Sequence, residues 1–186
     1  EIVGKPLEEC NMVICHLGNG SSITAIKDGK SYDTSMGLTP LEGLVMGTRC
    51  GDIDPTVVYY LCQHGYTVEE VNTILNKQSG YIGFYPKSSD AREVRAAAAA
   101  GDYKADLILR MQAKKVTDFI GSYFVYMGGI DTIVFTAGIG EKSPETRWEI
   151  CRRLKEALGV EIDEEKNKIK GELMEISTPN SKIKVL

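Results

Sequence analysis

The sequence predicts an α/β domain with a mixed sheet, and three observations lead to this prediction. Two turn signals, Asn19-Gly20 and Asp28-Gly29, separate short apolar segments near the start of the chain, which is typical of antiparallel hairpins. Several segments with helix-capping residues follow them. The apolar segment 131–136 comes after the longest of these helices, as expected for a helical crossover to a later strand.

Three strands are expected before residue 36. Met12–Cys15 is a short apolar run of the kind found in buried strands. Ile23–Ile26 follows the first turn, and Ser31–Ser35 returns after the second. A glycine-rich turn therefore lies between the first two strands.

Capping residues predict the first helices. Asp54-Pro55 begins one helix, which Gly65 ends. Thr67–Glu70 has the form of a capping box and begins the next. Asp90–Glu93 has the same form, and its helix runs through a stretch of alanines to Gly101.

The second half of the chain continues the alternation of helix and strand. A long helix is expected over Tyr103–Met127, with apolar positions wide enough for burial on two sides. The strand 131–136 leads into a glycine loop, Ala137–Lys142. Ser143 then caps a helix that ends at Gly159 and carries an apolar stripe of Trp148, Cys151, Leu154 and Leu158.

The composition narrows the range of functions. The chain has 186 residues, 42% of them apolar, which suits one globular domain. Its 22 basic and 26 acidic residues give a net charge of −4, which argues against a nucleic-acid partner. Apolar runs such as Val57–Cys62 are far too short to span a membrane. The five cysteines form no CxxC pair and match no zinc template, so reduced thiols in the cytoplasm are expected.

The two ends suggest part of a longer protein. The chain begins without Met at Glu1, and Gly4 and Pro6 are typical of the end of a helix. Lys182–Leu186 alternates like a strand that stops midway.

Two glycine turns are candidates for binding an anion. His16–Ser22 joins two strands, and its glycines permit close backbone approach to a phosphate, although a plain hairpin turn explains the same pattern. Gly138–Pro144 lies between a buried strand and a helix start, where α/β folds bind anions and nucleotides. It matches neither GxGxxG nor the P-loop pattern, so its role stays open at this point.

Arg49 is a third candidate. It lies in Met46–Pro55, a segment rich in glycine and small residues that precedes a helix. The planar guanidinium binds phosphate oxygens in pairs, which favours a phosphate role over a merely solvated side chain. A structural link from Arg49 to Asp52 or Asp54 is the alternative.

Four segments, taken in order, resemble motifs of the acetate kinases. The block Ser35–Pro55 is the most specific, and Cys15–Ser22 looks like the nucleotide-binding turn of that family. Ser88–Arg92 and Phe135–Glu141 are similar to two further family motifs. The resemblance covers essentially the whole chain, as the C-terminal domain of such an enzyme, residues 1–186.

The resemblance implies an actin-like (ribonuclease H-like) fold in which a mixed sheet is flanked by helices. It also implies phosphoryl transfer between ATP and acetate with Mg²⁺, in a cytoplasmic homodimer. Arg49 matches the arginine that stabilises the transferring phosphoryl group. By the same resemblance the nucleotide, ATP or ADP, is bound by His16, Leu17, Gly18, Asn19, Gly20, Gly138, Ile139, Gly140, Glu141 and Lys142, with Asp90, Ala91 and Arg92 at its adenosine end.

Two departures from the family pattern matter. Gly83–Lys87 carries a proline and two aromatic residues where the family has small ones, so the nucleotide preference is open. The N-terminal domain of the family, with further acetate-site residues, and its magnesium-binding glutamate, expected past Leu186, are missing. No metal ligand is therefore assigned within this chain. Propionate and butyrate kinases share the motifs, and a non-catalytic nucleotide-binding or dimerisation module is the alternative from another class.

Overall fold

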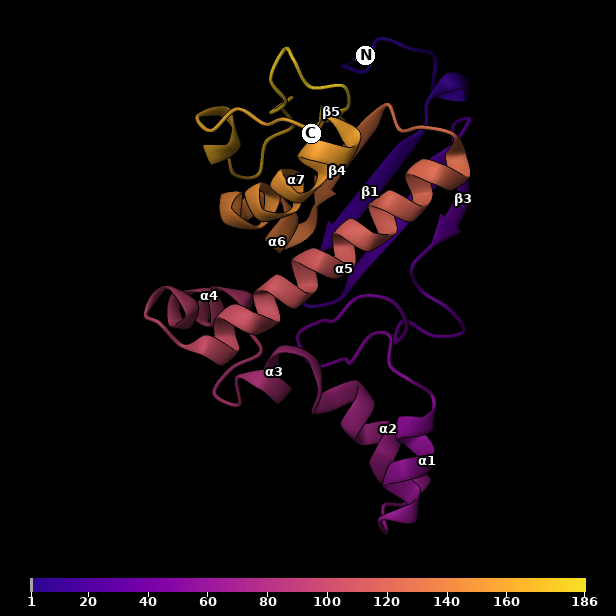
Figure 1. Ribbon diagram of the computed structural model, residues 1–186, viewed down its shortest axis with the longest axis vertical. Coiled ribbons are helices and arrows are strands. Elements are labelled where there is room, and N and C mark those ends of the chain that lie inside the picture. The colour runs from indigo at the N-terminus through magenta and orange to yellow at the C-terminus, as the bar shows by residue number, and fades with distance from the viewer. Residues whose placement is uncertain (1) are drawn as a thin grey trace. The chain divides into compact units, whose positions relative to one another are not determined.

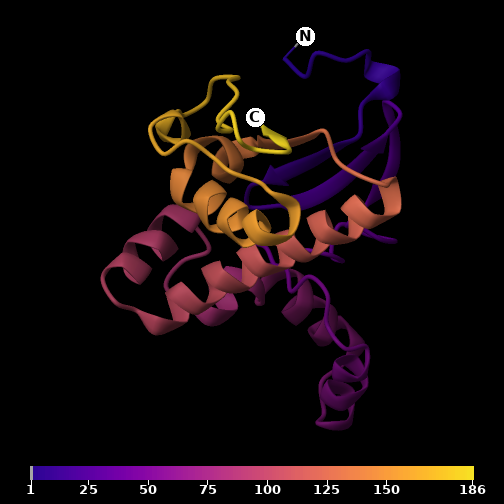
Figure 2. The same ribbon diagram turned by 45° about the horizontal axis from the view of Figure 1, so that its top comes forward.

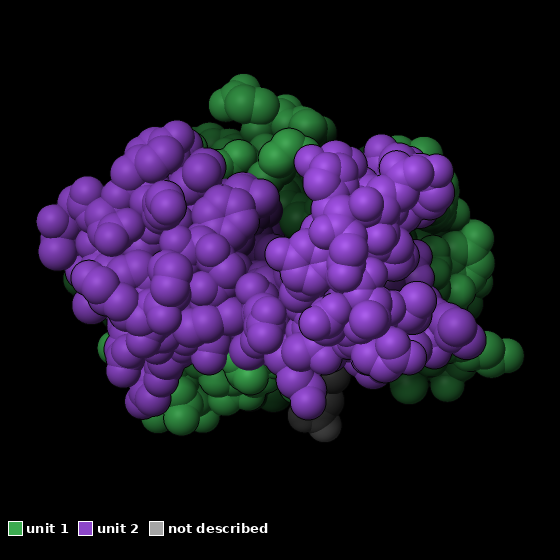
Figure 3. All heavy atoms as spheres, turned by 90° about the horizontal axis from the view of Figure 1, so that it is seen from below, with its two compact units in different colours: residues 1–35, 113–186 green, residues 36–112 purple. Residues whose placement is uncertain are grey.

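The computed structural model describes residues 2–186 of the chain. They form two compact units, which Figure 3 colours separately. The first unit contains the residues up to Ser35 together with Ala113–Leu186, and the second contains Met36–Gln112. The long helix α5, Tyr103–Met127, begins in the second unit and ends in the first.

The first unit is built on a mixed five-stranded sheet (Figure 1). Its strands are β1 (Met12–Leu17), β2 (Ser21–Lys27), β3 (Lys30–Thr34), β4 (Thr132–Thr136) and β5 (Lys184–Val185). They lie in the order β3-β2-β1-β4-β5. The first three are antiparallel, whereas β1, β4 and β5 are parallel. Every strand expected from the sequence is therefore confirmed.

The register of the sheet explains which residues form the core. Val13 pairs with Ala25 and with Ile133, and Cys15 pairs with Ile23 and with Phe135. These partners share one face of the sheet because side chains alternate along each strand. That face is buried, while the residues between them on β1, such as Ile14 and His16, are half-buried or exposed. The second half of α5 runs along the sheet (Figures 1 and 2).

The end of the first unit differs from the sequence prediction in two ways. Ala137–Lys142, expected to be a loop, is a short helix, α6. It forms at the ends of β1 and β4, whose backbones it contacts closely, so tertiary packing overrides the low helix propensity of its two glycines. Helix α7, Pro144–Leu158, begins at the Ser143 cap and ends at left-handed Gly159 as predicted.

The buried stripe of α7 is also shifted. Cys151 and Leu154 are buried as expected, but Trp148 is 40% exposed and Arg147 is only 3% exposed. The stripe therefore runs through an arginine rather than the tryptophan. On α5, Val116 and Ile120 are buried, but Met111 is 41% exposed, so this helix is buried mainly along one stripe.

The second unit consists of helices and an irregular segment. Residues 36–55 have no regular structure, and the helices are α1 (Thr56–Gln63), α2 (Val68–Lys77), α3 (Gly80–Phe84), α4 (Ala91–Ala99) and the start of α5. Only α3 was not predicted. It is five residues long and contains two glycines, so no local signal marks it.

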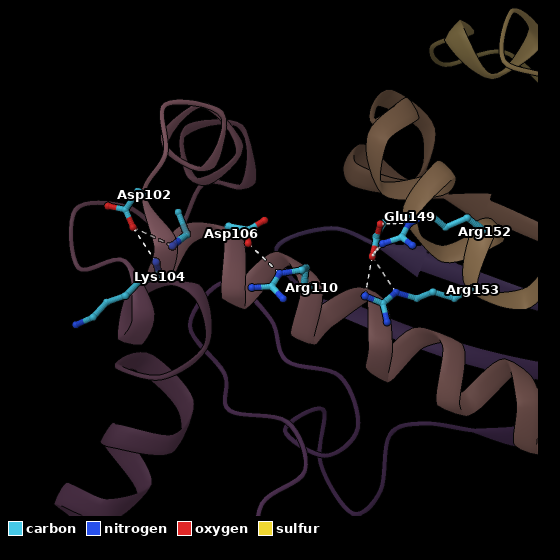
Figure 4. A network of polar contacts seen from close by, with 8 residues as sticks. Asp102, Lys104, Asp106, Arg110, Glu149, Arg152 and Arg153 are labelled. Atoms are coloured by element: carbon cyan, nitrogen blue, oxygen red, sulfur yellow. Dashed lines mark hydrogen bonds and ion pairs between the residues drawn. The ribbon is translucent and has the colours of Figure 1, made fainter.

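Capping in the second unit follows the sequence with one correction. Thr67 and Glu70 form the reciprocal capping box expected at α2. At α4 the Asp90 side chain accepts from the Arg92 backbone N–H, and no reciprocal bond from Glu93 completes a box within the described residues. Asp102 accepts from two backbone N–H groups at the start of α5 (Figure 4).

Among residues 2–186, no helix is both long enough and apolar enough to cross a membrane.

Candidate functional site

The two glycine segments meet at one edge of the sheet in the first unit. His16 on β1 pairs with Thr136 on β4, and these parallel strands end side by side. The turn 18–20 leaves β1 at this edge, and α6 leaves β4 there. The space beyond the carboxyl ends of adjacent parallel strands is where open α/β sheets bind ligands. The structure thus brings the first glycine turn and the second glycine segment together.

The first turn is held by its own hydrogen bonds. The Gly18 backbone N–H donates to the Gly20 carbonyl (3.1 Å) and to Ser21 Oγ (3.2 Å). A Cβ atom on Gly18 would lie 3.7 Å from Ala137 Cβ, which shows how closely the two segments approach. Leu17 is fully buried, whereas Asn19 is exposed.

The second segment, helix α6, begins at a strained residue. Ala137 has a φ of 63°, a left-handed conformation that is unfavourable for a residue with a Cβ. Glu141 Oε1 accepts from the Ala137 backbone N–H at 3.0 Å and so closes the turn. Ile139 and Gly140 are buried, while Gly138, Glu141 and Lys142 are exposed. The accessible groups of this segment are therefore a glycine backbone, one carboxylate and one ammonium.

His16 has a hydrogen-bond partner at the same edge. Its Nδ1 lies 3.0 Å from Thr136 Oγ1. The ring is exposed, and this contact links the end of β1 to the end of β4 through side chains. His64, by contrast, has Nδ1 2.8 Å from the Tyr60 carbonyl oxygen and lies at the end of α1.

Arg49 lies in the second unit on a sharply bent turn. The Met46 backbone N–H donates to the Arg49 carbonyl at 3.1 Å. The Arg49 side chain is half-buried, and its Nη1 donates to the Pro40 carbonyl oxygen at 2.6 Å. The Arg49 guanidinium has five N–H donors, and this is the one hydrogen bond that it makes to residues 2–186. Asp52 Oδ1 accepts from the Gly43 backbone N–H and Asp54 Oδ1 from that of Thr56, so both carboxylates stabilise backbone turns.

Helix α3 and the end of α2 hold the Arg49 turn in place. The Tyr81 and Ile82 backbone N–H groups donate to the carbonyl oxygens of Met46 (2.9 Å) and Gly47 (3.1 Å). Similar bonds join Ser79 to Thr48 and Cys50 to Leu75. Gln112 adds a further bond from its side chain to the Val45 carbonyl at 3.2 Å, and its Oε1 accepts from the buried Tyr81 hydroxyl. The turn is therefore fixed by backbone contacts from two helices.

Asp90, Ala91 and Arg92 form the start of α4. Arg92 folds back onto Asp90, with Nη2 2.5 Å from Oδ2, although its side chain is 87% exposed. Ala91 is buried. Hydrogen bonds from the side chain and the backbone of Arg92 lower the pKa of the Asp90 carboxyl to about 2.

The low pKa of Asp90 makes a testable prediction about pH. Because the folded-state pKa is below the unfolded value, Asp90 stabilises the fold above about pH 4 and loses this effect as pH falls through about 2. The thermal stability of Asp90→Asn relative to wild type is therefore expected to be constant from pH 5 to 7 and to converge on wild type as the pH approaches 2. An NMR titration that gives Asp90 an ordinary pKa near 4 contradicts this prediction.

No metal site is formed by the described residues alone. Residues 2–186 contain no group of three or more His, Cys, Asp or Glu side chains placed to hold a metal ion. The five cysteines are free, and burial raises the pKa of the Cys151 thiol to about 12. All five are buried or half-buried side chains.

The sequence prediction missed one residue next to the second glycine segment. Arg147 on α7 is buried and donates to the carbonyl oxygens of Gly140 and Glu141 at 2.7 and 2.9 Å. Its spacing of three and four residues from Ile150 and Cys151 places it on the buried stripe, and this was the available signal.

Comparison with known proteins decides the family. The model of the acetokinase family matches residues 1–186. The chain belongs to the acetokinase family. The acetate kinase of Dictyoglomus thermophilum is 53% identical over 186 residues, which are all of this chain and 46% of that protein. The acetate kinase of Methanosarcina thermophila is 51% identical over 185 residues, 99% of this chain and 45% of that protein.

Solved structures of this family have the same fold. The crystal structure of Porphyromonas gingivalis acetate kinase matches with a TM-score of 0.94 at 40% identity, covering 99% of this chain and 46% of the other. A propionate kinase from Francisella tularensis matches with a TM-score of 0.88 at 46% identity. The match covers 95% of this chain and 46% of the propionate kinase. The α/β fold class that the sequence predicted is thereby confirmed. The chain spans about half the length of the relatives it matches.

Proposed function

We propose that this chain is the nucleotide-binding part of a phosphotransferase that moves a phosphoryl group between ATP and acetate, giving acetyl phosphate and ADP. One observation carries the proposal: the two glycine segments lie side by side beyond the carboxyl ends of β1 and β4 in a member of the acetokinase family. Backbone N–H groups at such an edge bind phosphate oxygens.

We assign the following roles to the candidate residues. In the first unit, the backbones of His16–Gly20 and Gly138–Lys142 bind the phosphates of the nucleotide, and the exposed Lys142 adds a positive charge. In the second unit, Asp90–Arg92 contacts the adenosine. Arg49, with four free donors among residues 2–186, stabilises the charge on the transferring phosphoryl group.

The acceptor is proposed to be a short carboxylate. Acetate is the substrate named for the relatives from Dictyoglomus and Methanosarcina, and a propionate kinase matches the fold nearly as well. Incubating the complete protein with ATP and acetate, propionate or butyrate, and trapping the acyl phosphate as a hydroxamate, ranks the three by kcat/KM. Failure to form any acyl phosphate overturns the proposed function.

Magnesium is proposed to enter with the nucleotide. Residues 2–186 contain no group of three or more His, Cys, Asp or Glu side chains placed to hold a metal ion. When bound, Mg²⁺ neutralises phosphate charge. The residues described above bind and orient the nucleotide, and none of these roles depends on the magnesium ion.

The protein is further proposed to act as a cytoplasmic homodimer. Free cysteines throughout the described residues suit a reducing compartment. Helix α1 has no buried residue and exposes Val57, Val58, Tyr59 and Tyr60, of which Tyr59 is 62% exposed. These four consecutive residues surround the helix, and exposed apolar surface of this kind supports contact with a second copy of the chain.

The 186-residue chain by itself is expected to form no acetyl phosphate. It spans 46% of its relatives, and each power of ten in rate corresponds to about 1.4 kcal/mol, so loss of groups that position the acceptor abolishes measurable turnover. The assay compares the purified chain with the complete protein at equal concentration, expressed in a host without acetate kinase. Turnover by the chain alone contradicts this and favours a self-sufficient enzyme. Saturable ATP binding without turnover leaves the chain as a nucleotide-binding module.

A further inference from the structure

Arg147 is a buried cation whose hydrogen bonds are complete. Its side chain lies on the first turns of α7, and the residue is 3% exposed. The guanidinium has five N–H donors, and the structure gives it five acceptors, all of them uncharged oxygens. The acceptors are Asn167 Oδ1 (2.8 Å), the Gly140 carbonyl (2.7 Å), the Glu141 carbonyl (2.9 Å), the Asn167 carbonyl (2.5 Å) and the Ile169 carbonyl (2.9 Å).

Two of these acceptors belong to the second glycine segment. Gly140 and Glu141 lie in the last turn of α6, where carbonyl groups have no partner within the helix. Arg147 Nη1 donates to both and so fixes the end of this segment. The same segment is fixed at its start by the bond from the Ala137 backbone N–H to Glu141 Oε1. A Cβ atom on Gly140 would lie 3.4 Å from the Cys15 carbonyl oxygen, so little movement toward β1 is possible.

The other acceptors lie on a segment that the proposed function does not use. Asn167 is buried within the short 3₁₀ turn Lys166–Lys168 and accepts from Arg147 through both its side chain and its backbone. Its Nδ2 donates to the Pro144 carbonyl at 2.9 Å, which is at the start of α7. Arg147 and Asn167 thus connect the second glycine segment, α7 and residues 166–169 in one network.

The electrostatic arrangement suits a positioning role. Burial lowers the pKa of the Arg147 guanidinium, while the nearby Cys151 and Glu145 raise it. An arginine stays protonated even so, because its ordinary pKa is above 12. The positive charge is stabilised by carbonyl dipoles at the end of α6, and those carbonyls in turn are held in one orientation.

We propose that Arg147 is a positioning residue for the nucleotide, which holds the Gly138–Lys142 backbone in its binding conformation, with Asn167 as its partner. The inference rests on the proposed function, in which this segment binds the nucleotide phosphates. It extends the site to residues 166–169, which the Arg147 guanidinium joins to the nucleotide segment by hydrogen bonds.

The test is Arg147→Lys in the complete protein. A lysine has three donors on one nitrogen and is unable to reach the carbonyls of α6 and those of residues 167–169 at once. By analogy with residues that orient metal ligands, we expect KM for ATP to rise by about tenfold or more, while KM for the carboxylate stays within about twofold. Amide hydrogen exchange should quicken in residues 138–143 and 167–169, with β1 and β4 still protected.

The matched control is Arg152→Lys on the same helix. Arg152 pairs with Glu149 at the surface (Figure 4), and its side chain is 53% exposed. It is not one of the residues that Arg147 and Asn167 connect. Its replacement should leave both KM values and the exchange pattern unchanged. Asn167→Ala provides a milder variant, since it removes one acceptor of Arg147 and leaves four; a rise of about threefold in KM for ATP is expected.

The outcomes separate this inference from the proposed function. If the wild-type protein shows no saturable dependence on ATP, the proposed function fails. If the wild type saturates but folded Arg147→Lys and Asn167→Ala keep its KM for ATP, only the positioning role is overturned. If Arg147→Lys does not fold, Asn167→Ala decides: a lower melting temperature with unchanged KM shows a purely structural role and overturns the inference.

Discussion

In the complete protein, Arg49→Ala is expected to lower kcat by roughly 10³–10⁵, as loss of an arginine that stabilises the transferring phosphoryl group does in other enzymes. The charge on that group is spread over three oxygens, and a guanidinium meets two of them at once. Because the contact strengthens in the transition state, KM for ATP should change little. Steady-state kinetics over a range of ATP concentrations measures both values.

Two further variants make the Arg49 result specific. Arg49→Lys keeps the charge but loses the paired geometry, so it should recover little activity. Arg110→Ala removes an arginine of the same unit that is paired with Asp106 on the helix surface, and it should leave kcat unchanged. A folded Arg49→Ala protein with nearly normal kcat removes this residue from the mechanism. If the loss of activity follows a lower melting temperature, Arg49 has a structural role, through its hydrogen bond to the Pro40 carbonyl.

Gly80→Ala is expected to produce the largest loss of stability and to disrupt the Arg49 turn. Gly80 has a φ of +62°, which costs a non-glycine residue about 1–2 kcal/mol. Its added Cβ would also lie 2.1 Å from the Met46 carbonyl oxygen and 2.8 Å from that of Arg49, both of them backbone atoms. Such overlap costs a further ~1–3 kcal/mol. Urea unfolding measures the loss, and kcat of the remaining folded protein reports displacement of Arg49.

Gly65→Ala is a control that separates the cost of backbone strain from the cost of overlap between the added Cβ and neighbouring atoms. Gly65 has a φ of +92° in the same unit, but a Cβ there would meet nothing within 4 Å. This variant should lose only the ~1–2 kcal/mol of backbone strain and keep normal kcat. Equal losses of stability in Gly65→Ala and Gly80→Ala would contradict the close contact between α3 and the Arg49 turn.

Local signals in the sequence were sufficient for most of the secondary structure. The pairs Asn19-Gly20 and Asp28-Gly29 mark the two hairpin turns, and Thr67 and Ser143 mark helix starts that the structure confirms. The helix Tyr103–Met127 has the bounds expected from its apolar spacing. These features depend on interactions over a few residues, so the sequence contains them directly.

The short helices depended on tertiary contacts instead. The segments that form α3 and α6 each contain two glycines, which oppose helix formation. Helix α3 exists because its N–H groups find the carbonyls of Met46 and Gly47, and α6 because it packs on the ends of two strands. Such partners are distant in the sequence, and no local pattern identifies them.

The sequence by itself determined the strands, the capped helices and the family motifs of this protein, because each is encoded within a short stretch of residues. Only the tertiary structure decided which of them form the candidate site. It placed His16 beside Thr136 by pairing β1 with β4. It also buried Arg147 and exposed Trp148 on the same helix, because the acceptors that satisfy a buried guanidinium come from α6 and from Asn167, on separate segments of the chain.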